Sequence, residues 1–278
     1  MAVFLSLLTA AIYGTSDFCG GLAAQRAKLL QVVAGGHLVG LVGVVIASVL
    51  VADEFDTGDF LLGAAGGAFG AVAISLLYRR LAIGPMQVVA PVTAMTSAAV
   101  PAAWGIGSGD EISLAAWVGV ALGLVAIGLV SFSAAESHAP VTGAVIVESL
   151  LAGVGFGAFF IFLDATDAAS APWPVAGARL LTVVVLVPFL VLTRRPVVAR
   201  GAVALALIAV TGLLDTAANV TFLYASDHGL LTLVAVLSAM YPVATVVLAR
   251  LVLSERMTRP QMWGFLTAMA ATVLIAAG

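Results

Sequence analysis

The sequence predicts an all-α membrane protein, with ten transmembrane helices arranged as two inverted five-helix repeats around a central cavity. The 278 residues are 63% hydrophobic and 9% charged, whereas a soluble globular protein is about half apolar and about a quarter charged. Charged or turn-rich breaks divide the chain into ten apolar runs, each near the roughly 20 residues that a spanning helix needs. The two halves of the chain also resemble each other, which predicts the repeat.

Short connections join the ten runs, so we expect nearly the whole chain to lie in or at the bilayer. The first run lacks the basic start of a signal peptide and equivalent runs follow it, so we expect a retained helix. In chain order, the expected helices cover residues 2–24, 30–51, 59–78, 84–106, 112–133, 141–163, 172–193, 201–226, 229–250 and 258–277.

The repeat is visible in the fourth and ninth runs. "GPMQVVAPVTAM" (84–95) aligns with "GLLTLVAVLSAM" (229–240) at an offset of 145 residues, and the same offset places Gly119 on Gly264. Helices four and five therefore correspond to helices nine and ten. Polar residues that correspond at this or a nearly equal offset are Asp110 with Glu255, and His37 with Arg179.

Each half contains five runs, which is an odd number. After five crossings the chain has changed sides, so the second repeat enters the membrane in the opposite direction. Inverted repeats of this kind are typical of alternating-access transporters, whose central site faces each side in turn. We expect a first repeat over residues 1–135 and a second, inverted repeat over residues 139–278. Helices 1, 3, 4, 6, 8 and 9 are expected to surround the cavity, with helices 5 and 10 at the periphery.

Four segments carry a resemblance to a known family: "YGTSDF" (13–18), "GPMQVVAP" (84–91), "GDEIS" (109–113) and "YPVATVVLARLVLSERMTRPQMWG" (241–264), which contains the pair Glu255–Arg256. With the ten helices and the repeat, the whole chain resembles the ten-helix EamA-type members of the drug/metabolite transporter superfamily. The resemblance implies a membrane transporter that exports or exchanges small organic metabolites, such as amino acids or drug-like compounds. It implies neither a single substrate nor a catalytic residue.

Two other classes of protein stay open. The first is a polytopic membrane enzyme acting on a lipid or isoprenoid substrate, and the second is a structural or sensory membrane protein. Against an enzyme, the sequence has no metal-ligand cluster, phosphate-binding loop or catalytic triad, and Cys19 is its only cysteine. We therefore expect no enzyme activity, no metal and no cofactor. The net charge of −3 is spread over short loops, so nucleic acid is not an expected partner, and both a monomer and a homodimer fit.

The distribution of charge predicts how the protein sits in the membrane, because basic residues favour cytoplasmic connections. Ten of the eleven Lys and Arg lie in or beside the connections after helices one, three, five, seven and nine, and the other connections carry Asp and Glu without Lys or Arg. This asymmetry predicts a multi-pass protein of the inner (plasma) membrane with both termini outside. The ten are Arg26, Lys28, Arg79, Arg80, Arg194, Arg195, Arg200, Arg250, Arg256 and Arg259.

Five ionisable residues lie well inside the expected helices: Asp17, His37, Glu148, Arg179 and Asp215. A charged side chain near the bilayer centre costs about 2.5–3.5 kcal/mol on insertion scales, so such residues face the bundle interior and usually mark a pathway. Asp17, His37 and Glu148 each lie seven residues from the cytoplasmic end of a helix. At 1.5 Å per residue this depth is about 10 Å, which predicts one polar layer. Glu148 is alternatively an interfacial charge.

Each of these residues has a structural and a functional interpretation. Asp17 is either a hydrogen-bond partner, for example of His37, or a substrate or coupling site, with protons as the candidate coupling ion. Asp215 and Asn219 share a helix face at the depth where substrates bind in such folds. Arg179 either binds a substrate carboxylate through two parallel hydrogen bonds or extends to the membrane surface.

Aromatic residues and prolines complete the candidate site. Tyr13 and Tyr241 are the aromatic residues that we expect in the cavity, because each adjoins a polar position or a bend. Pro91, Pro101 and Pro242 are expected to bend helices four and nine, since proline removes a backbone hydrogen bond. These two helices correspond in the repeat, so paired bends suit a rocking motion around a central site.

Overall fold

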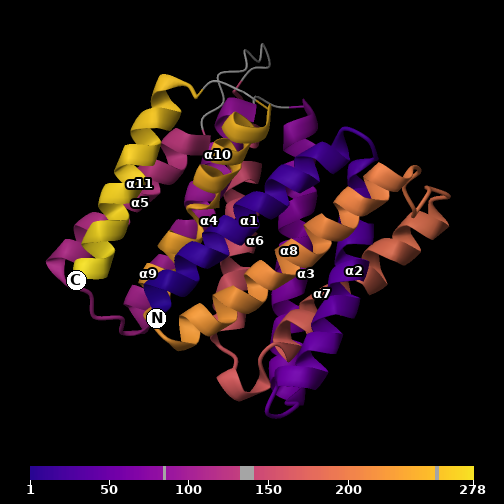
Figure 1. Cartoon of the computed structure of the whole chain (residues 1–278), viewed down its shortest axis with the longest axis horizontal. Coiled ribbons are helices and arrows are strands. Elements are labelled where there is room, and N and C mark those ends of the chain that lie inside the picture. Colours follow the sequence, from indigo (N-terminus) through magenta and orange to yellow (C-terminus); the bar gives the residue numbers. More distant parts are fainter. Residues whose placement is uncertain (84–85, 132–140, 254–256) are drawn as a thin grey trace.

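The computed structural model describes residues 1–83, 86–131, 141–253 and 257–278, and the elements that these residues form are all helices (Figure 1). Ten segments are long and apolar enough to cross a membrane, which confirms the predicted all-α membrane fold. The helices of the first half are α1 (Ala2–Ala24), α2 (Leu29–Val51), α3 (Thr57–Ile83), α4 (Met86–Ser108) and α5 (Leu114–Ser131). Those of the second half are α6 (Gly143–Asp164), η1 (Ala168–Ser170), α7 (Trp173–Leu192), α8 (Ala202–Asp227), α9 (Leu231–Ser238), α10 (Tyr241–Leu253) and α11 (Arg259–Ala277).

The helix bounds agree with the expected ones to within three residues, except at the end of α3. This helix continues to Ile83, past the expected end at residue 78, and so carries Arg79 and Arg80 on its last turns. The expected start of helix four at residue 84, the expected end of helix five at residue 133 and the pair Glu255–Arg256 lie outside the described residues.

The ninth expected helix is divided in two. α9 ends at Ser238, and α10 begins at Tyr241 with Pro242 as its second residue. A proline in the first turn of a helix loses nothing, because the N–H at that position has no intrahelical partner. α4 differs, because it is helical through both Pro91 and Pro101.

Helices of the first half pack mainly on helices of the second. α1 packs against α8, and α3 packs against α6; likewise α2 packs against α8, and α3 against α7. If each helix of one half is replaced by its counterpart in the other half, the contact of α1 with α8 becomes that of α6 with α3. In the same way the contact of α2 with α8 becomes that of α7 with α3. α5 packs against α11, a contact that the exchange converts into itself.

Glycines at the contact between α5 and α11 repeat this exchange in atomic detail. A Cβ atom added to Gly119 would lie 2.8 Å from Cγ1 of Ile275, and one added to Gly264 would lie 2.6 Å from Cγ2 of Val130. The 145-residue offset converts one of these contacts into the other. Reciprocal close contacts are what a pseudo-two-fold arrangement predicts, and superposing helices 1–5 on helices 6–10 would test it.

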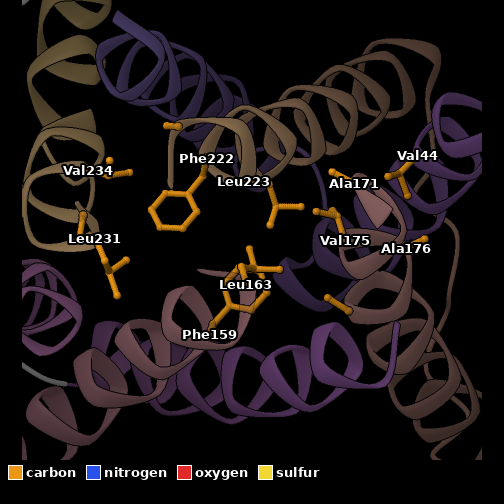
Figure 2. Packing of buried hydrophobic residues seen from close by; sticks show 13 residues of the cluster. Val44, Phe159, Leu163, Ala171, Val175, Ala176, Phe222, Leu223, Leu231 and Val234 are labelled. Atoms are coloured by element: carbon orange, nitrogen blue, oxygen red, sulfur yellow. The ribbon is translucent and has the colours of Figure 1, made fainter. Parts of the chain in front are cut away.

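Both termini lie at the same end of the bundle (Figure 1). At this end the connections carry acidic residues, so we call it the acidic end; the opposite end, with the basic connections, is the basic end. A buried apolar cluster fills the bundle near the acidic end (Figure 2). It comprises, among others, Phe159 and Leu163 of α6, Phe222 and Leu223 of α8, and Leu231 and Val234 of α9. Each of these six residues is at most 9% exposed.

Candidate substrate-binding cavity

A cavity of about 500 Å³ lies inside the bundle, and side chains from both halves line it. α1, α2, α3 and α4 contribute from the first half, and α6, α7, α8 and α10 from the second. α2 and α7 were not expected to line it. α5 and α11 contribute only near their basic ends, through Val130, Ser131 and Gln261. The lining thus reaches the basic end of the bundle, and toward the other end it meets the apolar cluster at Phe159, which belongs to both.

Arg179 of α7 is the centre of a polar network in the cavity wall. Its Nε donates a hydrogen bond to Oγ1 of Thr216 over 3.2 Å, and its Nη1 lies 3.2 Å from Nε2 of His37. Its Nη2 lies 2.5 Å from Oδ2 of Asp215, close enough for an ion pair but not aligned as a hydrogen bond. Arg179 therefore does not extend to the membrane surface; it is 5% exposed and joins α2, α7 and α8.

The contact with Arg179 fixes the protonation of His37. A guanidinium has only donors, so Nε2 of His37 must accept the hydrogen bond, and the imidazole is neutral with its proton on Nδ1. Nδ1 is buried and has no hydrogen-bond partner among the described residues. The sequence had suggested Asp17 as the partner of His37, but the described contacts pair His37 with Arg179 instead.

A second chain of hydrogen bonds holds Tyr13 in the cavity wall. The Tyr13 hydroxyl donates to Oδ1 of Asn219 over 2.7 Å, and Nδ2 of Asn219 donates to the backbone oxygen of Asp215 over 2.7 Å. The ring of Tyr13 lies 6.1 Å from the ring of Tyr241 and 6.2 Å from that of Phe160, measured between centroids. These contacts place an aromatic wall beside the polar network.

Asp17 lies one turn after Tyr13 on α1, and it lines the same cavity. Its side chain is exposed to the cavity, and it makes no hydrogen bond or ion pair with any of the described residues. Asp215, the other carboxylate of the lining, has its charge opposed by Arg179. Asp17 is therefore the carboxylate that the cavity leaves uncompensated within the described part of the chain.

Glu148 occupies a different place from the other sequence-predicted residues. It does not line the cavity. Its carboxylate accepts hydrogen bonds from Nη2 of Arg79 and Nε of Arg80, both over 2.7 Å, and so joins α6 to the basic end of α3. The expected polar layer of three residues is therefore reduced to Asp17 and His37. The sequence missed the pairing because it assigned both arginines to a connection, whereas α3 continues through them.

The cavity also has hydroxyl residues that the sequence analysis did not select. Thr93 and Ser97 of α4, Thr182 of α7 and Thr245 of α10 all line it. Their hydroxyls bond to backbone oxygens; for example, Oγ1 of Thr245 donates to the oxygen of Gly14 on α1 over 3.1 Å. A Ser or Thr inside an apolar helix is a weak sign of a binding site, because its hydroxyl can donate a hydrogen bond to a backbone oxygen of its own helix.

An all-helical membrane bundle with a largely apolar cavity between its two halves, into which a few charged and polar groups project, is typical of a membrane transporter. Residues 142–277 match the sequence model of the EamA-like transporter family. The second half of the chain is thus similar to this family of membrane transporters, in agreement with the sequence resemblance. A solved crystal structure of another protein matches 98% of this chain and 94% of its own, with a TM-score of 0.73 and 17% identity. At this identity it supports the fold alone. No curated protein sequence matches the chain.

Proposed function

We propose that the protein moves small organic metabolites or drug-like compounds across the membrane by alternating access, as an exporter or exchanger. The observation that carries this proposal is a cavity between the two halves that holds an uncompensated carboxylate, Asp17. A charged group inside a spanning helix is costly and usually functional. A binding or coupling role explains why α1 retains one.

Contacts at the acidic end support one state of such a cycle. Oδ2 of Asp110, which follows α4, accepts hydrogen bonds from N and Oγ1 of Thr232 on α9, over 2.9 and 2.7 Å. Oδ2 of Asp59 on α3 accepts from Oγ of Ser170 over 2.6 Å. Both contacts join the first half to the second. With the apolar cluster behind them, they correspond to a conformation closed at the acidic end.

The direction of transport follows from orientation, which we propose from the basic residues: the basic end faces the cytoplasm and both termini face outside. In this orientation the cavity loads from the cytoplasm and the closed end must open for release. The reciprocal contacts of Gly119 and Gly264 support inverted repeats, in which each half can adopt the conformation of the other.

A reconstituted transport assay tests the proposed function. Purified protein in liposomes is screened by counterflow with labelled amino acids and with phenyltrimethylammonium. Ala71 lines the cavity, and its neighbour Val72 is 61% exposed on the outside of the helix. We expect Ala71→Trp to fill the cavity and lower flux at least tenfold, and Val72→Trp to leave flux unchanged. The proposal is contradicted if both substitutions leave flux unchanged, or if no compound in the panel is transported.

A further inference from the structure

We infer that the cavity selects hydrophobic organic monocations, and that Asp17 holds their charged group. This inference deepens the proposed function, because it names the substrate class of the same cavity. It rests on the charges, the exposure and the aromatic rings of the described lining residues.

The charges of the lining do not balance without a ligand. When both carboxyl groups are ionised, Asp17 and Asp215 each contribute a negative charge, and Arg179 contributes one positive charge. His37 contributes none, because it accepts a hydrogen bond from Arg179. The described lining therefore carries one uncompensated negative charge in a medium where charges interact strongly. A bound monocation neutralises it, and a zwitterion or an anion does not.

The positive and negative groups also differ in accessibility. The Arg179 side chain is 6% exposed and is covered by Asp215, Thr216 and His37, so an anionic ligand would first have to displace Asp215. Asp17 needs no displacement, because its carboxylate is exposed to the cavity without a partner among the described residues. A ligand entering the cavity thus meets a free carboxylate before it meets a free guanidinium.

The aromatic rings favour a cation attached to an apolar body. Tyr13 and Asp17 are four residues apart on α1 and so share one face of the helix. The Tyr13 ring is held by its hydrogen bond to Asn219 and by the rings of Tyr241 and Phe160. A cation within about 6 Å of such a ring is attracted to its face. The volume of about 500 Å³ falls within the range that accepts a drug-sized ligand.

Three probes of one shape test the inference by binding to the purified protein in detergent. Phenethylamine, phenylalanine and 3-phenylpropionate share a phenylethyl body and are cationic, zwitterionic and anionic at neutral pH. Isothermal titration calorimetry should show phenethylamine binding at least tenfold more tightly than either of the others. Asp17→Asn should weaken the binding of phenethylamine at least tenfold. It should also reduce the difference in affinity between phenethylamine and the other two probes. Asp227→Asn, at a carboxylate that is 45% exposed outside the cavity, is the matched control and should change nothing.

Each contrary outcome has a distinct meaning. Equal or tighter binding of phenylalanine or phenylpropionate, no binding of any of the three, or phenethylamine binding that survives Asp17→Asn overturns the inference. These results come from binding measurements and do not depend on flux. If they overturn the inference, transport of a compound other than an organic cation in liposomes would still support the proposed function. Conversely, cation binding that requires Asp17, in a protein without flux, would overturn the proposed function and leave the binding site standing.

Discussion

Arg179 shows how several buried polar residues depend on one side chain. Three of its nitrogens lie against His37, Thr216 and Asp215, so it joins three helices and sets the charge state of the histidine. The sequence identified Arg179, His37 and Asp215 as buried, because charges inside apolar runs are conspicuous. It could not pair them, since the pairing depends on how α2, α7 and α8 pack. That packing is a tertiary property with no local signal.

Removing Asp215 should therefore destabilise the protein. Asp215→Ala leaves Arg179 buried without its counter-ion, and breaking a buried pair in this way costs about 3–5 kcal/mol. Asp215 is 30% exposed to the cavity, so we expect the lower end of that range. Thermal unfolding in detergent measures the loss, and Arg179→Met combined with Asp215→Leu should recover most of it. An Asp215→Ala variant as stable as the parent would contradict the ion pair.

Asp17 leads to a prediction about transport and pH. Asp17→Asn removes a charge and a titratable proton but keeps the shape of the side chain, so it should abolish pH-dependent flux in liposomes while stability stays the same. The other titratable or charged groups that face the same cavity are Tyr13, His37, Arg179, Asp215 and Tyr241. If one of those couples transport instead, the variant keeps the pH profile of the parent. A variant that is less stable and transports normally would give Asp17 a structural role.

At the scale of the helices, close crossings depend on glycine. Gly67 of α3 faces the backbone of Ala178 on α7, where an added Cβ would lie 2.6 Å from Cα. Gly212 of α8, at the 145-residue offset from Gly67, faces the backbone of Gly36 on α2 in the same way. Small residues at such positions let helix backbones approach in membranes. The apolar runs predicted the helices well, but only the packing shows which of the many glycines lie at a crossing.

Gly67→Ala should reverse the usual effect of this substitution. Alanine normally stabilises a helix by up to about 1 kcal/mol relative to glycine. At Gly67 the added methyl group meets backbone that cannot rotate away, so we expect a loss of about 1–3 kcal/mol. Gly107→Ala on α4 is the control, because nothing lies within 4 Å of its added Cβ. Equal unfolding temperatures for both variants would rule out the close crossing.

The sequence predicted the division between α9 and α10 only in part. Pro242 predicted a bend in helix nine, whereas the structure ends one helix at Ser238 and starts another at Tyr241. Pro91 and Pro101 carried the same signal, yet α4 is helical through both. A proline in the interior of a helix removes one hydrogen bond, but the surrounding helices decide whether the chain breaks there or continues.

At the scale of the whole molecule, the two ends of the bundle differ in charge and in closure. The acidic end carries both termini, the apolar cluster and the hydrogen bonds of Asp110 and Asp59 across the halves, whereas the cavity lining reaches the basic end. The orientation that we propose predicts that green fluorescent protein fused after Gly278 stays dark when exported unfolded, while a phosphatase fused there is active. A fluorescent fusion with an inactive phosphatase would reverse the orientation and, with it, the direction of loading.

The central claim is that the cavity opens to each side in turn, and closure of the acidic end tests it most directly. Asp110 and Thr232 join the halves there through hydrogen bonds of 2.9 and 2.7 Å. The measurement is counterflow by an Asp110→Cys, Thr232→Cys variant in a Cys19→Ser background, before and after treatment with a short bis-methanethiosulfonate cross-linker. We predict that cross-linking holds the acidic end closed and stops flux, that reductant restores it, and that each single-cysteine variant is unaffected. Full flux through a completely cross-linked protein would contradict alternating access through this end.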